Sequence, residues 1–477
     1  MPQNEDQLKK RQEKREAQRR KQQAEAKRLK RTLFLAVLVL IACGFGIYKL
    51  TQTTPAEDME QVQVVETKPV ETEKPTRPID KDPITKIHIK AAGDLNVTTK
   101  VVDSGLAVSG YDYSPVFKDV AAILADADLT VMNFEGNVCG EPYGSETTSA
   151  PIQLLHALRG CGVDLLQMAN SCAINNGLNG LTATLQSIRA AGMEPLGAYA
   201  TASELRTSKG YTMTEIQGIK VAFVAFTKGL GGRGMPAGSE GLVNLLYKDY
   251  ATTYKEIDRE GITAILKNVE AEKPDITIAM LHWGSEYNDD ISKTQDSIVN
   301  LMQEQGVDVI LGTHPHTLQP IIFDENKGTM VVYSLGDFFG DAVRGATNYS
   351  IILDIEITKD ANAGTTRVTD YSFTPIYTVT ETESIGNDDR KVVRISKAIE
   401  ANQGNFLDKI NETCKANMEY ALVRIDERIA TTEEVDCPDC NKVVSVLANK
   451  NGVLVNEATC KNCKAKLPAG SRLKDYD

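Results

Sequence analysis

Two of the five histidines in the chain stand one residue apart in VDVILGTHPHTLQP, residues 307–320. The apolar run before them reads as a buried strand that ends at Gly312, and a similar run, DITIAMLHWG, ends at His282. In extended backbone, residues i and i+2 point to the same side, so His314 and His316 are placed to face one ion or one substrate. Pro315 stiffens the segment between them.

Other apolar segments end in polar side chains of related chemistry. KIHIKAAGD ends at Asp94, DLTVMNFEG near Glu135, and GVDLLQMAN at Asn170. A single strand-end Asp is more often a turn or a helix cap, and His282 alone would more often be a packed histidine. Their joint occurrence favours a metal site, because α/β sheets bind ligands beyond the carboxyl ends of their strands. Mixed oxygen and nitrogen donors suit manganese, iron or zinc better than calcium.

The segments that end in these residues alternate with helical stretches from about residue 85. Helices are expected at 151–160, 179–191, 251–272 and 293–305. Strands that alternate with helices predict an α/β fold. After His316 the pattern changes to strands alone, which predicts an antiparallel portion that closes the sheet or a second sheet packed on the first.

Five short motifs, in this order, resemble the CapA family of poly-γ-glutamate capsule synthesis proteins, which are related to calcineurin-like metallophosphoesterases. The motifs are GD (93–94), NFEG (133–136), HWGSEY (282–287), GTHPHTLQP (312–320) and YSLGDF (333–338). The resemblance covers about residues 85–345. It implies a four-layer α/β/β/α metallophosphoesterase-like domain, here placed at residues 85–380. It also implies a membrane-anchored, extracytoplasmic role in making, exporting or processing an anionic polymer such as poly-γ-glutamate.

The resemblance also implies roles for individual residues. It assigns Glu286 and Tyr287 to the lining of the site. The positions that it assigns to metal binding are Asp94, Glu135, His282, His314 and His316.

One motif departs from the family, whose pattern resembles A-N-N-H-x-L-D-Y-G where this chain has ANSCAINNG, residues 169–177. Asn170 is retained as a candidate ligand, whereas Cys172 replaces a histidine that serves general acid–base catalysis in the related phosphoesterases. A thiol is a poor acid, although Cys172 becomes a possible thiolate ligand if a metal lowers its pKa. Asp337 stands where the family usually has asparagine.

These departures leave three functions open. One is a capsule assembly protein that binds or processes an anionic polymer. Another is an active metal-dependent hydrolase of phosphoesters or γ-glutamyl amides, with His282, His314 and Cys172 as catalytic candidates. The third is a non-catalytic surface adaptor. The glycine-rich segment TKGLGGRGMPAGSEG (227–241) is expected either to border the site, with Lys228 and Arg233 contacting an anion, or to be a plain connector.

The first 84 residues predict a membrane anchor and its flanks. Residues 1–31 hold twelve Lys and Arg against five acids, and residues 32–50, TLFLAVLVLIACGFGIYKL, are long and apolar enough to span a bilayer. The basic flank predicts a cytoplasmic N-terminus and an extracytoplasmic main domain. A lipidated Cys43 and a buried core helix are the alternatives. Residues 51–84 are rich in Pro, Thr and Glu and predict a linker.

The C-terminal residues 433–477 contain two CxxC pairs, Cys437 with Cys440 and Cys460 with Cys463. This spacing is typical of a structural zinc ribbon, with two disulfides as the alternative. Residues 381–432 are expected to be a helical connector. With a net charge of −12 and a basic N-terminus, the main domain is acidic, so no nucleic-acid partner is expected.

Overall fold

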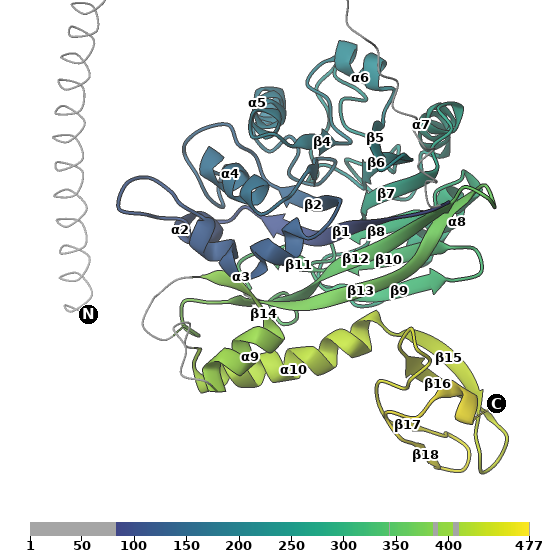
Figure 1. Cartoon of the computed structure of the whole chain (residues 1–477). Coiled ribbons are helices and arrows are strands. Elements are labelled where there is room, and N and C mark those ends of the chain that lie inside the picture. Colours follow the sequence, from purple (N-terminus) through teal and green to yellow (C-terminus); the bar gives the residue numbers. More distant parts are fainter. Residues whose placement is uncertain (1–82, 343, 385–389, 404–409, 477) are drawn as a thin grey trace, which may run out of the picture. The chain divides into compact units, whose positions relative to one another are not determined.

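The computed structural model describes residues 83–342, 344–384, 390–403 and 410–476 (Figure 1). The predicted cytoplasmic segment 1–31, the anchor 32–50 and nearly all of the linker 51–84 lie outside these residues. Within the described ranges, no helix is both long and apolar enough to cross a bilayer.

Two β-sheets form the centre of the fold. The first sheet contains β1 (Ile84–Asn96), β2 (Leu129–Glu135), β3 (Leu165–Gln167), β4 (Glu194–Leu196), β11 (Asp337–Phe339), β12 (Tyr349–Asp360), β13 (Thr365–Val379) and β14 (Lys391–Arg394). The second contains β5 (Thr212–Ile216), β6 (Ile219–Thr227), β7 (Ile276–His282), β8 (Val309–Thr313), β9 (Leu318–Asp324) and β10 (Thr329–Leu335).

The strand orders are β14-β13-β12-β1-β2-β3-β4 in the first sheet, with β11 beside β1, and β5-β6-β7-β8-β10-β9 in the second. The strands that alternate with helices pair in parallel, as β1 does with β2 and β7 with β8. The late strands supply antiparallel pairs to both sheets, because β12 pairs with β1 and β9 pairs with β10. The predicted change to strands alone after His316 is confirmed, and these strands belong to both sheets.

The second sheet has two buried faces because alternate side chains of a strand point to opposite sides. Val221 and Ile278 pack into the core that it shares with the first sheet. On the same two strands, Val224 and Leu281 face the other way and pack against the helices α7 (Arg259–Ala271) and α8 (Lys293–Glu304). The helices α3 (Ser114–Ala125), α4 (Ile152–Gly160) and α5 (Gly177–Ala190) pack with the first sheet (Figure 1). The layers therefore run helix, sheet, sheet, helix, and the predicted α/β class is confirmed.

Three of the four predicted helices match α4, α5 and α8 within two residues at each end. The helix expected at 251–272 begins only at Arg259, so its predicted start was wrong. Asp258 caps this helix by accepting a hydrogen bond from the Gly261 N–H at 3.1 Å. An N-cap residue has non-helical backbone, so the chain before Asp258 does not continue the helix.

The C-terminal part of the chain combines sheet, helix and a separate small core. The connector expected at 381–432 contains the helices α9 (Ile395–Gln403) and α10 (Glu412–Ile429), and also β14, which extends the first sheet. Residues 433–477 contain most of β15 (Thr431–Asp436), and β16 (Val443–Ala448), β17 (Ala458–Thr459), β18 (Lys466–Leu467) and the short 3-10 helix Leu473–Asp475. The remaining helices are α2 (Thr99–Asp103) and α6 (Ala202–Ser208).

Two glycines bring the strand ends close enough to form a site. A Cβ atom at Gly93 would lie 1.8 Å from the carbonyl oxygen of Gly336, and one at Gly312 would lie 2.0 Å from that of Tyr333. Any side chain would separate these segments. As a result, Asp94 at the end of β1 lies in register with Asp337 at the start of β11.

Candidate metal centre

The ends of four strands from both sheets meet at one buried site. Asp94 lies near the end of β1, Glu135 and His282 end β2 and β7, and His314 follows β8. All four side chains are buried. The ring centroids of His282 and His314 are 4.5 Å apart, and those of His314 and His316 are 6.0 Å apart. The structure therefore brings together the residues that the strand ends predicted.

His282 is oriented by residues behind it. Its Nδ1 lies 3.1 Å from the hydroxyl of Thr313, which donates a hydrogen bond to Gln167 Oε1 at 3.1 Å. Asn133 Nδ2 also lies 3.4 Å from Nδ1. In the tautomer in which Nδ1–H donates to the Thr313 hydroxyl, the lone pair of the ring is on Nε2. Nε2 lies 2.9 Å from Glu135 Oε1, the distance of an ion pair.

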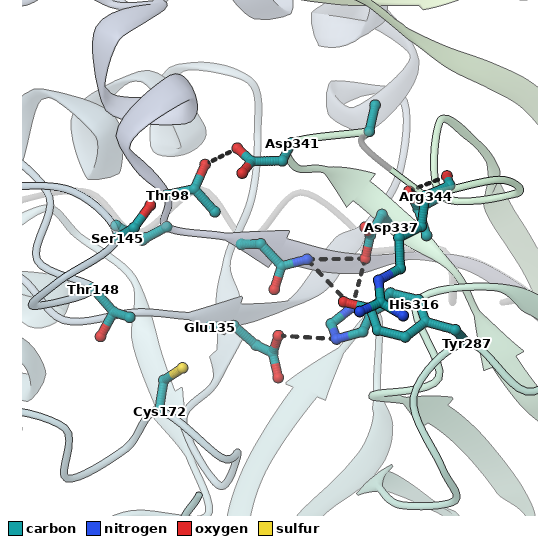
Figure 2. A pocket seen from close by; sticks show the side chains of 14 residues that line it. Thr98, Glu135, Ser145, Thr148, Cys172, Tyr287, His316, Asp337, Asp341 and Arg344 are labelled. Carbon is teal, nitrogen blue, oxygen red and sulfur yellow. Dashed lines mark hydrogen bonds and ion pairs between the residues drawn. The ribbon is translucent and has the colours of Figure 1, made fainter.

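His316 lies among carboxylates at the other side of the site. Its Nδ1 lies 2.8 Å from Asp337 Oδ1 and 3.5 Å from Asp94 Oδ2, and its Nε2 lies 3.8 Å from Glu135 Oε2 (Figure 2). Asn96 donates to the same Asp337 oxygen at 2.9 Å. His316 therefore connects carboxylates from β1, β2 and β11.

Possible ligand atoms gather in three overlapping groups, each within 4.8 Å. The groups are Glu135 with His282 and His314; Glu286 with His314 and His316; and Asp94 with His316 and Asp337. The shared histidines link neighbouring groups into one continuous arrangement. Its nitrogen and carboxylate donors are the types that manganese, iron and zinc prefer.

Burial and nearby charges shift the pKa values of the three buried carboxylates, Asp94, Glu135 and Asp337. Burial, followed by the neighbouring Glu135, raises the pKa of Asp94 well above its ordinary value. Burial also raises the pKa of Asp337, although His316 opposes this shift. Burial alone would raise the pKa of Glu135 too, but His282 and His316 outweigh it and the pKa is lowered. Three carboxylates in one buried site require positive charge beside them.

The histidines divide into two neutral rings and one charged ring. Burial lowers the pKa of His282, despite the opposing effect of Glu135, and lowers that of His314 well below its ordinary value. Burial would lower the pKa of His316 as well, but Asp337 and the other carboxylates raise it well above that value. Neutral rings at His282 and His314 offer the lone pairs that metal coordination needs.

These residues fit a divalent cation. Nδ1 of His314 is buried without a hydrogen-bond partner among the described residues, and Nε2 of His282 faces Glu135. Two cis ligand atoms with bonds of about 2.1 Å to one ion lie about 3 Å apart. The separation of 2.9 Å between His282 and Glu135 matches this spacing.

Unusual backbone conformations hold two of these loops in place. The φ angles of His314, His316 and Tyr287 are +91°, +60° and +58°, values that are uncommon for residues other than glycine. The His314 N–H donates to Asp94 Oδ2 at 3.0 Å, and the Tyr287 N–H donates to the carbonyl of Pro315 at 2.8 Å. Such conformations cluster at functional sites, where surrounding contacts enforce them.

The model of the family described as "Bacterial capsule synthesis protein PGA_cap" matches residues 88–342, which is more than half of the chain and includes the whole cluster. The chain belongs to this capsule synthesis family. It is 27% identical over 267 residues to the PGA biosynthesis protein CapA of Bacillus subtilis (strain 168), which covers 55% of this chain and 64% of the relative. It is 24% identical over 285 residues to the capsule biosynthesis protein CapA of Bacillus anthracis, covering 58% of this chain and 66% of the relative. The match thus spans less than two thirds of either relative.

Two solved structures show weaker similarity to this PGA_cap chain. The calcineurin-like phosphoesterase YfkN from Bacillus subtilis aligns with 18% identity and a TM-score of 0.39, covering 72% of this chain and 98% of that one. A phosphatase from Mycoplasma pneumoniae aligns with 13% identity and the same TM-score of 0.39, covering 62% and 94%. We infer no chemistry from similarity at this level.

Other predicted site residues of this PGA_cap chain surround the cluster. The carboxylate of Glu286 reaches His314 and His316, and the ring of Tyr287 stacks on His316 with centroids 5.4 Å apart. The charge of Lys228 is within reach of Glu286, and its ammonium group donates to the carbonyl of Gly284 at 2.5 Å.

Asn170 and Cys172, the two predicted site residues of the altered motif ANSCAINNG, lie in different surroundings. Asn170 is occupied by protein groups, since its amide donates to Phe134 and its Oδ1 accepts from the Cys172 N–H at 3.0 Å. Cys172 lines a pocket beside Glu135 and is partly exposed there (Figure 2). Burial and the Glu135 charge raise the pKa of this thiol to about 12, and the exposed Arg233 only partly opposes them. The thiol is therefore neutral near pH 7 in the metal-free protein.

The four C-terminal cysteines also converge, and none forms a disulfide. Their sulfur atoms all lie within 4.8 Å of one another, with 3.5 Å between Cys437 and Cys463 and 3.7 Å between Cys440 and Cys460. Tetrahedral thiolates with metal–sulfur bonds of about 2.3 Å lie about 3.8 Å apart.

Sequence reasoning missed Asp337 as a member of the cluster and Arg344 as a pocket residue. Asp337 was noted only as a departure from the family. The dipeptide GD occurs at 93–94, 336–337 and 340–341, and the structure places the first two in register. Arg344 follows no strand end and belongs to no motif, so nothing in the sequence marked it.

Proposed function

We propose that this protein is a membrane-anchored, extracytoplasmic member of its family. In this role it uses a divalent metal site in the synthesis, export or processing of an anionic capsular polymer such as poly-γ-glutamate. The convergence of Glu135, His282 and His314 within the region that matches the family supports this proposal. The apolar run 32–50 after a basic segment supports the anchor.

A divalent ion held by these residues would supply Lewis-acid chemistry toward a phosphoryl or carbonyl oxygen. The chain's own residues would orient the substrate. Lys228 and the exposed Glu286 flank the histidines, and the Tyr287 ring covers His316. Cys172, as a neutral thiol with a pKa of about 12, does not replace the general acid that the related phosphoesterases have at this position.

Deletion and complementation in the source bacterium would test the role in polymer formation. We expect deletion to change the amount or chain length of the surface polymer, and the wild-type gene to restore it. A gene encoding His282→Ala with His314→Ala should fail to restore it at equal protein level. Unchanged polymer after deletion would refute the proposal, and full complementation by the double variant would refute the metal site's role.

The linked ligand groups favour a second, narrower function as a metal-dependent hydrolase of phosphoesters or γ-glutamyl amides. The purified chain, supplied with manganese, iron or zinc, would be assayed on a phosphodiester and on poly-γ-glutamate. We expect cleavage that is lost in His314→Ala with His316→Ala. Inactivity of the metal-loaded wild type on both substrates would instead support the non-catalytic adaptor.

For the C-terminal module we propose a structural zinc. The sulfur positions of Cys437, Cys440, Cys460 and Cys463 support a four-thiolate site, which leaves no position open for a substrate. The metal would stabilise a small module whose apolar core consists of few residues, such as Val446, Leu454 and Leu467.

A further inference from the structure

A small cavity opens directly beside His316. Its volume is about 230 Å³, and its lining includes Glu135 and Asp337 of the metal cluster together with Thr148 and Arg344 (Figure 2). Pockets for drug-sized ligands measure about 300–1,000 Å³. The cavity therefore has room for one small chemical unit beside the metal cluster.

The guanidinium group of Arg344, in the lining of this cavity, lies over an aromatic ring. The guanidinium carbon of Arg344 lies 4.1 Å from the ring centroid of Tyr287, which itself stacks on His316. Contact with an aromatic face holds an arginine in place without using its hydrogen-bond donors. Arg344 is exposed and forms no ion pair with a carboxylate among the described residues.

The carboxylates around the cavity already have partners. Asp337 accepts from Asn96 and pairs with His316, while Asp341 accepts a hydrogen bond from the hydroxyl of Thr98 (Figure 2). Arg344 consequently keeps its planar set of donors for a molecule that enters the cavity. Such a set matches the paired oxygens of a carboxylate or a phosphate.

We infer that Arg344 and Tyr287 form an oxyanion subsite, which binds a single carboxylate or phosphate group of the substrate next to the metal cluster. The inference rests on the proposed function and narrows it, because a cavity of this size takes one acidic unit of a chain and not an extended stretch. Arg344 is a specificity residue here, and Tyr287 positions it. The hydroxyl of Ser145 lines the same cavity and supplies a further donor, because it only accepts hydrogen bonds from Thr99.

Anion binding to the full-length chain tests the subsite. Calorimetric titrations with inorganic phosphate and with N-acetylglutamate would be run on the wild type, on Arg344→Gln and on the matched control Arg367→Gln. Arg367 is exposed on β13 and is absent from the lining of the cavity. The metal content of every sample would be measured by mass spectrometry.

We expect Arg344→Gln to weaken binding of at least one anion about tenfold or more, with unchanged metal content, while Arg367→Gln binds as the wild type does. The anion bound more tightly identifies a phosphoester or a carboxylate substrate. Tyr287→Phe should keep the affinity because it keeps the ring, and Tyr287→Ala should lose it.

Equal binding by the wild type and Arg344→Gln, or no binding of either anion by the wild type, would overturn the subsite. A wild type without metal that still binds an anion through Arg344 would refute the proposed metal site and support the subsite. The two proposals therefore fail in different ways.

Discussion

Glu135 and His282 end strands of the two different sheets and bring Oε1 and Nε2 to 2.9 Å, the distance of an ion pair. His282 is fully buried and neutral, since burial lowers its pKa. A buried ring nitrogen at this distance from a buried carboxylate either pairs with it or shares a cation with it. A shared cation also explains why Nδ1 of the adjacent His314 is buried without a hydrogen-bond partner among the described residues.

The first prediction concerns metal content. His282→Ala should remove at least one equivalent of bound manganese, iron or zinc, because the group formed with Glu135 and His314 loses a ligand. Mass spectrometry of the purified full-length chain measures this loss. His156→Ala is the matched control, since His156 is an exposed histidine on α4. Equal metal in the His282 variant and the wild type would remove the metal-centre interpretation.

A second prediction separates zinc from disulfides in the C-terminal module. Cys460→Ser should lower bound zinc by one equivalent, while Cys139→Ser should leave it unchanged because Cys139 lies outside the thiolate cluster. Thiol counting in denaturant with chelator should detect all nine cysteines of the wild type. A count that lacks the four cysteines of the cluster would establish disulfides instead.

The third prediction concerns the reactivity of Cys172. With its pKa raised to about 12 by burial and by Glu135, only about one thiol in 10⁴ is ionised at pH 8. Iodoacetamide should therefore alkylate Cys172 in the metal-free protein at least about 10³-fold more slowly than a free cysteine. Peptide mass spectrometry over time gives the rate. Rapid alkylation would mean that the thiol ionises readily, and Cys172 would again be a candidate general acid.

A fourth prediction links pH to stability through Asp308, the residue just before β8. Burial raises its pKa to about 6, despite the hydrogen bond that it accepts from the Thr277 N–H at 2.7 Å. The folded state thus binds this proton more tightly than the unfolded state, whose pKa is 3.8. This contribution to stability is complete below about pH 4 and is lost as pH rises through about 6.

Asp308→Asn should therefore raise the free energy of unfolding at pH 8, by no more than about 3 kcal/mol, with a smaller gain at pH 5. The difference in urea unfolding between variant and wild type at the two pH values measures this. Asp324→Asn is the control of opposite sign, because the Lys327 N–H lowers the pKa of the partly buried Asp324. A gain for Asp308→Asn that is independent of pH would contradict the assignment.

Sequence pattern was enough for the α/β class, the boundaries of three helices (α4, α5 and α8) and the strand-end histidines and carboxylates. These features depend on local pattern: alternation and apolar runs define strands, and polar residues at their ends remain at one edge of a parallel sheet.

Which of these groups meet depends on how the two sheets pack. Asp337 lies beside Asp94 because Gly93 and Gly336 allow two distant segments to approach, and no periodicity reports such a contact. Likewise, Arg344 reaches the ring of Tyr287 across more than fifty residues of chain. Local pattern fixes where a side chain lies on its own strand or helix, whereas contacts between sheets depend on the register and packing of the whole core.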